Sequence, residues 1–368
     1  DFSLPSGEAF FNNFVDIANI ISRVTGGSRS DINGLIRANG TANLFLINPS
    51  GIVFGPNASL NIGGSFVAST ADSLKFEGGK EFSATNPQAP PLLTVSVPLG
   101  LQFGSNPGRI VNQSTNPNGA VKFPGVPPGL QVPIGKTLAL VGGNVTLEGG
   151  NLTGLNGRIE LGSVGTGLVN LTESPQGYVL GYSGVQNFQD IQISGGTLLN
   201  AANVEGGGSI QLKGSNINLT GGARIFSTNL GTGTGGTLTV DAAESVNLSG
   251  ANTTLLTYTS GTGSAGDLTI TTRKLTVKDG ASIQTPSLGP GQAGNLLVKA
   301  SDSVELSGTT ANGQPSGLSG QVGRNAIGNG GNLTVETRRL TIRDGARITA
   351  STSGAGRAGN VRVTASDV

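Results

Sequence analysis

Cysteine, histidine, tryptophan and methionine are all missing from this chain of 368 residues. Without cysteine or histidine, the chain lacks the usual zinc ligands, a thiol nucleophile and an imidazole base. The sequence therefore predicts no metal site, no cofactor and no catalytic residue. The missing methionine also indicates a processed or trimmed chain, from which any signal peptide has already been removed.

Charged residues are scarce as well, at 12% of the chain, which is about half the usual share. The net charge is only +1, and basic residues occur at most in pairs such as Arg273-Lys274, so nucleic-acid binding has little electrostatic support. No run of 18 apolar residues is present to predict a membrane-spanning helix. Glycine, however, reaches 62 residues and apolar types 35%, which favours a folded, turn-rich protein over a disordered one.

Short apolar runs that follow a glycine repeat through the second half of the chain. Six of them align as GGSIQL, GGTLTV, AGDLTI, AGNLLV, GGNLTV and AGNVRV, and their starts are separated by 28, 30, 28, 37 and 28 residues. Each full repeat holds two further short runs, such as NINLTG and ARIFS in the first one. Three strands of about four residues, with Gly or Asn between them, predict one turn of a three-sided coil.

This repeat length, without a helical pattern, predicts an all-β fold: a right-handed parallel β-helix, or three-sided solenoid. Alternation assigns the two sides of each strand, with Leu238 and Val240 directed inward and Thr239 outward. A single coil buries too little apolar surface to offset its ordering entropy, so stability has to come from stacked coils.

Two columns of residues follow from stacking the repeats. At one corner the column is Asp267, Asn295, Asn332 and Asn360, which we interpret as a ladder of side-chain hydrogen bonds. On the second face, an outward column is Ser249, Lys278, Ser307 and Arg343. Neutral and basic residues alternate in this second column. A neutral coil between two cations doubles their separation from about 4.8 Å to about 9.6 Å, and the alternation therefore indicates charge spacing.

Aromatic residues and prolines divide the chain into three parts. Of 13 phenylalanines 11 lie in the first third, and ten of 17 prolines lie between residues 83 and 135. We predict an aromatic-rich N-terminal β segment over 1–82, a Pro-rich irregular or hairpin excursion from the β-helix over 83–135, and regular coils over 136–368, cut within a repeat. Over 9–24 the apolar residues also fit a 3.6-residue period, so a helix there is an alternative to strands.

Four segments carry a resemblance to a known family: EAFFNN (8–13), NIISRVTGG (19–27), DINGLIRANGTANLFLINPSGIVFG (31–55) and GGSFVAST (63–70). They resemble the N-terminal secretion (TPS) domain of filamentous haemagglutinin-type exoproteins of two-partner secretion. The later stretches KTLALVGGNVTLEGGNLT, GRIELGSVG and GVQNFQDIQ resemble the larger cyanobacterial members of that family. Members usually carry residues before this point, so we expect the first strands to be missing here and the natural protein to continue after Val368.

The family's Asn-Pro-Asn-Gly-Ile motif has a counterpart with serine at its third position: Asn48, Pro49, Ser50, Gly51 and Ile52. From the residues alone, Asn at the first, Pro at the second and Gly at the fourth position predict a type I turn between two strands. The resemblance adds a role in secretion to this turn. The family's other motif, Asn-Pro-Asn-Leu, has no match near Ile17–Ile20.

The resemblance implies a secreted, non-catalytic exoprotein or adhesin of a Gram-negative bacterium. Such proteins cross the periplasm, are recognised through the N-terminal domain by an Omp85-type outer-membrane pore, and form β-helical fibres at the cell surface for adhesion, aggregation or biofilm formation. Surface glycans, other cells, and side-by-side or end-to-end copies of the fibre are the further partners it implies. A chain without cysteine suits passage through an oxidising periplasm in the unfolded state.

Three other functions are compatible with a repetitive β-rich or glycine-rich sequence. A β-helical protein that binds or cleaves polysaccharides is the main alternative, but cleavage needs clustered carboxylates, and the 21 acidic residues are scattered. An ice-binding solenoid needs unbroken threonine columns, and Leu297 interrupts the column of Thr239 and Thr269. Residues 231–236 fit G-x-G-x-x-G, yet a strand-like run follows them instead of the helix that a dinucleotide site requires.

Overall fold

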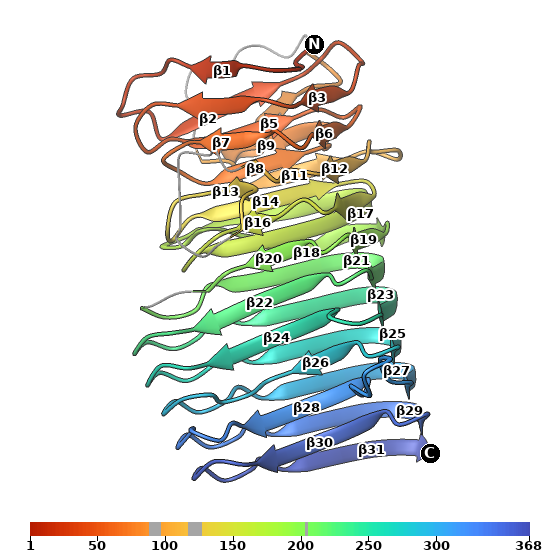
Figure 1. Cartoon of the computed structure of the whole chain (residues 1–368). Coiled ribbons are helices and arrows are strands. Elements are labelled where there is room, and N and C mark those ends of the chain that lie inside the picture. Colours follow the sequence, from red (N-terminus) through yellow and green to blue (C-terminus); the bar gives the residue numbers. More distant parts are fainter. Residues whose placement is uncertain (88–96, 117–126, 203–204) are drawn as a thin grey trace. The chain divides into compact units, whose positions relative to one another are not determined.

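The computed structural model describes residues 1–87, 97–116, 127–202 and 205–368, and in this part of the chain the fold is all-β (Figure 1). A single 3₁₀ turn, Glu77–Gly79, is the one helical element of the described residues. The chain divides into two compact units: unit 1 holds residues 1–154 and 158–192, and unit 2 holds residues 155–157 and 193–368. Strand β19 (Ile191–Ser194) contains the boundary between them.

Unit 1 consists of parallel coils with three faces. The strands of its first face pair in the order β2 (Asn19–Arg23), β5 (Asn43–Ile47), β8 (Phe66–Ser69), β14 (Thr137–Gly142) and β17 (Arg158–Ser174). The second face is β3 (Ser30–Ile32), β6 (Ile52–Phe54), β12 (Ile110–Asn112) and β15 (Val145–Glu148). The third face holds β1 (Glu8–Phe11), β4 (Leu35–Ala38) and β7 (Ser59–Asn61), and separately β13 (Leu130–Gln131) with β16 (Leu152–Thr153). A parallel β-helix, as the family resemblance implies for the N-terminal part, is thus the architecture of these coils.

An antiparallel sheet covers the first face of unit 1. Its strands are β10 (Glu81–Ser83), β9 (Ser73–Lys75), β11 (Gly100–Phe103), the outer half of β17 and β18 (Gly177–Phe188). Residues from both layers form one apolar cluster, in which the rings of Phe45 and Tyr178 meet edge to face with centroids 5.3 Å apart. The run Leu44-Phe45-Leu46-Ile47 is continuously apolar because β5 is buried on both sides.

Two sequence expectations can be compared with unit 1. The helix considered over residues 9–24 is not formed, because this segment provides β1 and β2, which pair with β4 and β5. The hairpin of β17 and β18 lies inside the stretch from residue 136 for which only regular coils were expected. Its turn follows Ser174, and Gly177 has φ = 90°, a backbone angle that glycine tolerates best. The division of the chain at residues 82 and 135 stays a proposal.

Unit 2 is a stack of regular coils (Figure 1). Long, continuous strands form its first two faces: β21 (Ser209–Leu219), β23 (Leu238–Ser249), β25 (Leu268–Lys278), β27 (Leu296–Ser307), β29 (Leu333–Arg343) and β31 (Val361–Asp367). The pairing of the first five strands shifts register between the two faces. The third face is β20 (Leu198–Asn200), β22 (Arg224–Asn229), β24 (Thr254–Thr259), β26 (Ser282–Gln284), β28 (Gly317–Val322) and β30 (Arg347–Thr352).

The register of these strands is the one that the sequence repeats predict. Leu238 pairs with Leu268 and Thr239 with Thr269, and both leucines are fully buried. The pairing of the second-face column is confirmed too, although Ser307 is buried and not exposed as expected. Its four members pair in sequence: Ser249, Lys278, Ser307 and Arg343. The guanidinium of the last one contacts Glu305 (2.7 Å) on its neighbouring strand.

We expect Ser307→Lys to lower the free energy of unfolding more than Ser249→Lys, by about 1 kcal/mol. A lysine at 307 would lie between Lys278 and Arg343, whereas a lysine at 249 has only Lys278 beside it. Ser307 is also only 7% exposed, which adds a desolvation cost. Thermal unfolding of the two purified variants measures the difference, and 1 M salt should reduce it. Equal shifts of the two variants would contradict the charge-spacing interpretation.

Candidate functional site

The Asn48-Pro49-Ser50-Gly51 segment joins β5 to β6 by a tight turn. The Gly51 N–H donates to the Asn48 carbonyl (3.0 Å), which closes the turn as the sequence predicts for type I chemistry. The Asn48 side chain is fully buried and uses both ends of its amide. Its Nδ2 donates to the Ser28 carbonyl (2.9 Å) and to Ser30 Oγ (2.9 Å), while its Oδ1 accepts from the Ser50 N–H (3.0 Å).

Backbone hydrogen bonds hold the turn between the preceding and the following coil. Ser30 N–H donates to the Gly51 carbonyl (3.0 Å) on one side, and Gly108 N–H donates to the Pro49 carbonyl (2.8 Å) on the other. Gly51 has φ = 117°, and a Cβ there would lie 3.0 Å from the Arg109 carbonyl oxygen. The turn thus requires glycine at this position for backbone conformation and for space.

Burial divides the five motif residues into two groups. Asn48, Gly51 and Ile52 are buried, Pro49 is half-buried, and Ser50 is exposed. A partner that meets the folded turn can contact mainly Ser50 and Pro49, whereas the buried members act by shaping the coil. The exposed position is also the one at which this chain has serine in place of the family's asparagine.

An exposed apolar segment lies in the same unit, between β1 and β2. The side chains of Phe14 and Val15 are 82% and 73% exposed, the largest values among the exposed apolar residues of the described part of unit 1. The sequence did not predict this feature, because the 3.6-residue period over 9–24 placed Phe14 on the apolar side of a helix and Val15 gave no signal of its own. Large apolar side chains exposed next to each other are typical of binding surfaces.

The corner column of unit 2 forms a chain of hydrogen bonds across successive coils. Asp267 Oδ1 accepts from the backbone N–H (2.7 Å) and side-chain amide (3.1 Å) of Asn295. Asn295 Oδ1 accepts from the Asn332 N–H (3.0 Å), and Asn332 Oδ1 accepts from the N–H (3.1 Å) and the amide (3.2 Å) of Asn360. The acceptor oxygens of this column therefore serve the next coil, and we propose a structural role for it.

Unit 1 also contains a buried carboxyl group that the sequence pattern did not single out. Glu160, on the first face in β17, is fully buried, and its Oε1 lies 2.8 Å from Arg158 Nη2. Its Oε2 has no hydrogen-bond partner among the described residues, and neither does the buried hydroxyl of Tyr182. Burial raises the pKa of Glu160 to about 7, although Arg158 acts in the opposite direction. Without access to solvent, this group has no route to a substrate.

Two features of the described residues concern a metal site and a dinucleotide site. They contain no group of three or more Asp and Glu residues placed to hold a metal ion. The G-x-G-x-x-G segment, residues 231–236, joins β22 to β23, so a strand follows it, as the sequence suggests. Across the described ranges, none of the helical structure is long and apolar enough to cross a membrane.

Comparison with known proteins finds a matching family and similar solved structures. A family model described as the TPS secretion domain matches residues 1–212, more than half of the chain. Among solved structures, the secretion domain of HMW1 from Haemophilus influenzae is similar over 99% of this chain and 91% of its own, with a TM-score of 0.52 and 20% sequence identity. At this identity the likeness concerns the fold alone. No curated protein matches the chain.

Proposed function

Because the chain belongs to the TPS secretion domain family, it is part of a two-partner secretion exoprotein, and we propose that an Omp85-type outer-membrane pore recognises its N-terminal part. Proteins of this kind are secreted by Gram-negative bacteria through the periplasm and across the outer membrane. The family match over residues 1–212 is the observation that carries the proposal. The segment of 1–82 with the Asn48–Ile52 turn would supply the recognition signal.

Two surfaces of unit 1 suit contact with a pore. The exposed pair Phe14 and Val15 offers apolar area, and the turn at Pro49 and Ser50 offers a rigid backbone. Buried Asn48 and Gly51 would contribute indirectly, because they hold that turn in place. This division of roles makes the family motif both a fold element and a secretion signal.

We further propose that the exported chain acts at the cell surface as a non-catalytic fibre for adhesion, aggregation or biofilm formation. The regular coils of unit 2 support this, since each presents a strand edge on which the following coil pairs in register. Coils that form one after another outside the cell would draw the chain outward without ATP. Surface glycans and further copies of the fibre remain the proposed partners.

The first proposal is tested by measuring whether secretion of the chain depends on the pore. Cells that produce the full chain with its signal peptide, together with the Omp85-type pore of an adjacent gene, should release it into the medium. Cells without the pore should retain it in the periplasm, because no other route recognises the N-terminal coils. Immunoblots of medium and periplasm measure the ratio, and an unrelated periplasmic protein controls for leakage. Equal release in both strains would contradict recognition by the pore.

A further inference from the structure

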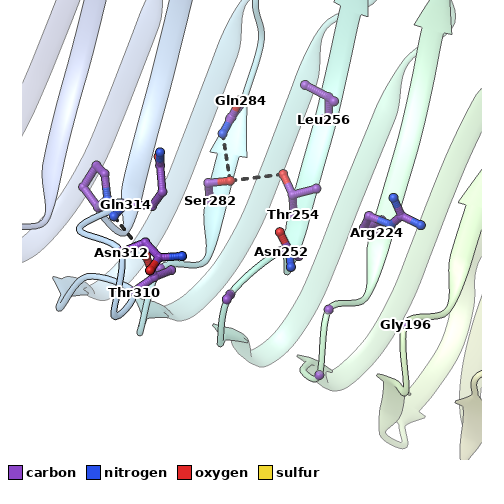
Figure 2. A pocket seen from close by; sticks show the side chains of 15 residues that line it. Gly196, Arg224, Asn252, Thr254, Leu256, Ser282, Gln284, Thr310, Asn312 and Gln314 are labelled. Carbon is purple, nitrogen blue, oxygen red and sulfur yellow. Dashed lines mark hydrogen bonds between the residues drawn. The ribbon is translucent and has the colours of Figure 1, made fainter.

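A polar groove crosses the third face of unit 2. It has a volume of about 930 Å³, and its floor and sides come from four successive coils (Figure 2). Thr254, Ser282 and Gln284 lie on its floor, where Ser282 Oγ is 3.2 Å from Thr254 Oγ1 and accepts from Gln284 Nε2 (2.8 Å). The groove thus presents hydroxyl and amide groups, and one hydrogen bond, between Ser282 and Thr254, links two successive coils.

An insertion borders one end of this groove. The repeat from Asn295 to Asn332 has 37 residues where its neighbours have 28, and extra residues form a loop after Ser307. Within the loop Thr310 N–H donates to the Gln314 carbonyl (2.8 Å), which fixes Asn312 and Gln314 at the rim (Figure 2). A second hollow of about 400 Å³ extends from the loop to Arg347. It shares Ser282, Gln284, Gln314 and Pro315 with the first hollow, so the two adjoin along the floor.

The strand register places residues that line the two hollows in one column. Successive coils pair Arg224 with Thr254, Thr254 with Ser282, Ser282 with Gly317, and Gly317 with Arg347. At about 4.8 Å per coil, the two arginines lie about 19 Å apart along the column. A Cβ at Gly317 would clash with the Arg347 carbonyl oxygen, so the column requires glycine at this position.

The two arginines are available for a ligand. Within the described ranges neither guanidinium has an ion-pair partner; that of Arg224 lies 5.8 Å from the centroid of the Phe226 ring. Neither hollow has an acidic residue in its lining. Beside the column, the half-exposed side chains of Phe226 and Leu256 pair in register and provide an apolar strip.

We propose that this face binds an acidic oligosaccharide whose chain runs along the column, across the coils. Hydroxyl and amide groups at regular spacing match the hydroxyls of successive sugar units, and the apolar strip suits the flat face of a sugar ring. Arginines at the two ends match carboxylates, which a guanidinium can bind with two parallel hydrogen bonds. This inference gives the proposed adhesive role a ligand class, and it is tested on the purified chain, independently of secretion.

Calorimetric titration of the full purified chain with hexagalacturonate tests the proposal, with the same oligosaccharide reduced to its neutral form as the comparison. We expect binding of the acidic form and at least tenfold weaker binding of the neutral form. Arg224→Gln and Arg347→Gln should each weaken binding about tenfold, since each removes a charge-assisted contact. High salt should weaken binding as well.

Arg362→Gln is the matched control, because Arg362 lies on the first face, in β31. The affinity of the Arg362→Gln variant for hexagalacturonate should equal that of the unchanged chain. A second variant, Thr254→Glu, places a carboxylate between the arginines and should reduce binding by repulsion. Absence of hexagalacturonate binding, equal binding of the neutral form, or equal losses for Arg224→Gln and Arg362→Gln would each overturn the proposal and leave pore-dependent secretion unaffected.

Discussion

Gly51→Val and Asn48→Ala are each expected to abolish secretion of this chain. Valine at 51 would have to adopt φ = 117° with its Cβ 3.0 Å from the Arg109 carbonyl oxygen, so the turn would open. Alanine at 48 leaves the Ser28 carbonyl, Ser30 Oγ and the Ser50 N–H without their buried partner. Asn48→Ala should lower the free energy of unfolding by about 3 kcal/mol. The ratio of secreted to periplasmic protein measures the secretion of both variants.

Two further variants distinguish an effect on the fold of the turn from an effect on its recognition by the pore. Asn57→Ala changes an exposed asparagine in the turn that follows β6, and secretion should be unchanged. Ser50→Arg changes the exposed motif residue while leaving its neighbours in place. If the pore contacts the folded turn, Ser50→Arg reduces secretion while the purified variant unfolds at the normal temperature. Normal secretion of both Gly51→Val and Asn48→Ala would show that the motif has no role in export.

Unit 1 should become less stable as pH rises from 5 to 8. Burial raises the pKa of Glu160 from its ordinary value of 4.5 to about 7. Between these values the folded state keeps a proton that the unfolded chain releases, so the free energy of unfolding falls with rising pH and levels off above 7. The full loss corresponds to about 3 kcal/mol. The sequence has no histidine, and no imidazole therefore titrates in the same window.

Glu160→Gln should remove most of this pH dependence. Glutamine keeps the shape of the side chain but does not titrate, so the variant should unfold at nearly the same temperature at pH 5.5 and pH 8. Glu148→Gln is the control, since Glu148 is exposed and accepts a hydrogen bond from Gln113 Nε2 (2.9 Å). Thermal unfolding followed by circular dichroism measures both. A steep pH profile that survives in Glu160→Gln would assign the effect to other groups, such as Asp72, whose pKa burial also raises.

The parts of the fold that repeat could be predicted from the sequence. Alternation placed Leu238 and Leu268 inside, and counting residues between runs set the register that pairs Lys278 with Ser307. Because each coil repeats the same pattern of apolar and polar residues, local patterns are enough to predict the buried positions and the strand register. The antiparallel sheet over unit 1 does not repeat, and its strands β9, β11 and β17 come from distant segments that no periodicity connects.

The candidate site was predicted in part. Turn chemistry identified the segment from Asn48 to Gly51, but it could not show that the Asn48 side chain is buried between coils. Nothing in the sequence indicated that Glu160 is buried. An acidic residue in a β-type run is expected to be exposed until the sheet that covers it is known. The groove could not be predicted for a similar reason. Arg224 and Arg347 are more than 120 residues apart and share one column only after four coils have stacked.

The edge-to-face contact of Phe45 with Tyr178 has a consequence for the order in which an exported chain can mature. Residues 133 positions apart complete the same apolar layer, and the Tyr178 hydroxyl also donates to Asn19 Oδ1 (3.2 Å) at the start of the first face. A chain that leaves the cell N-terminus first exposes Phe45 and Ile47 long before their cover arrives. The earliest coils therefore reach their final stability late, once the β17–β18 hairpin has followed them out.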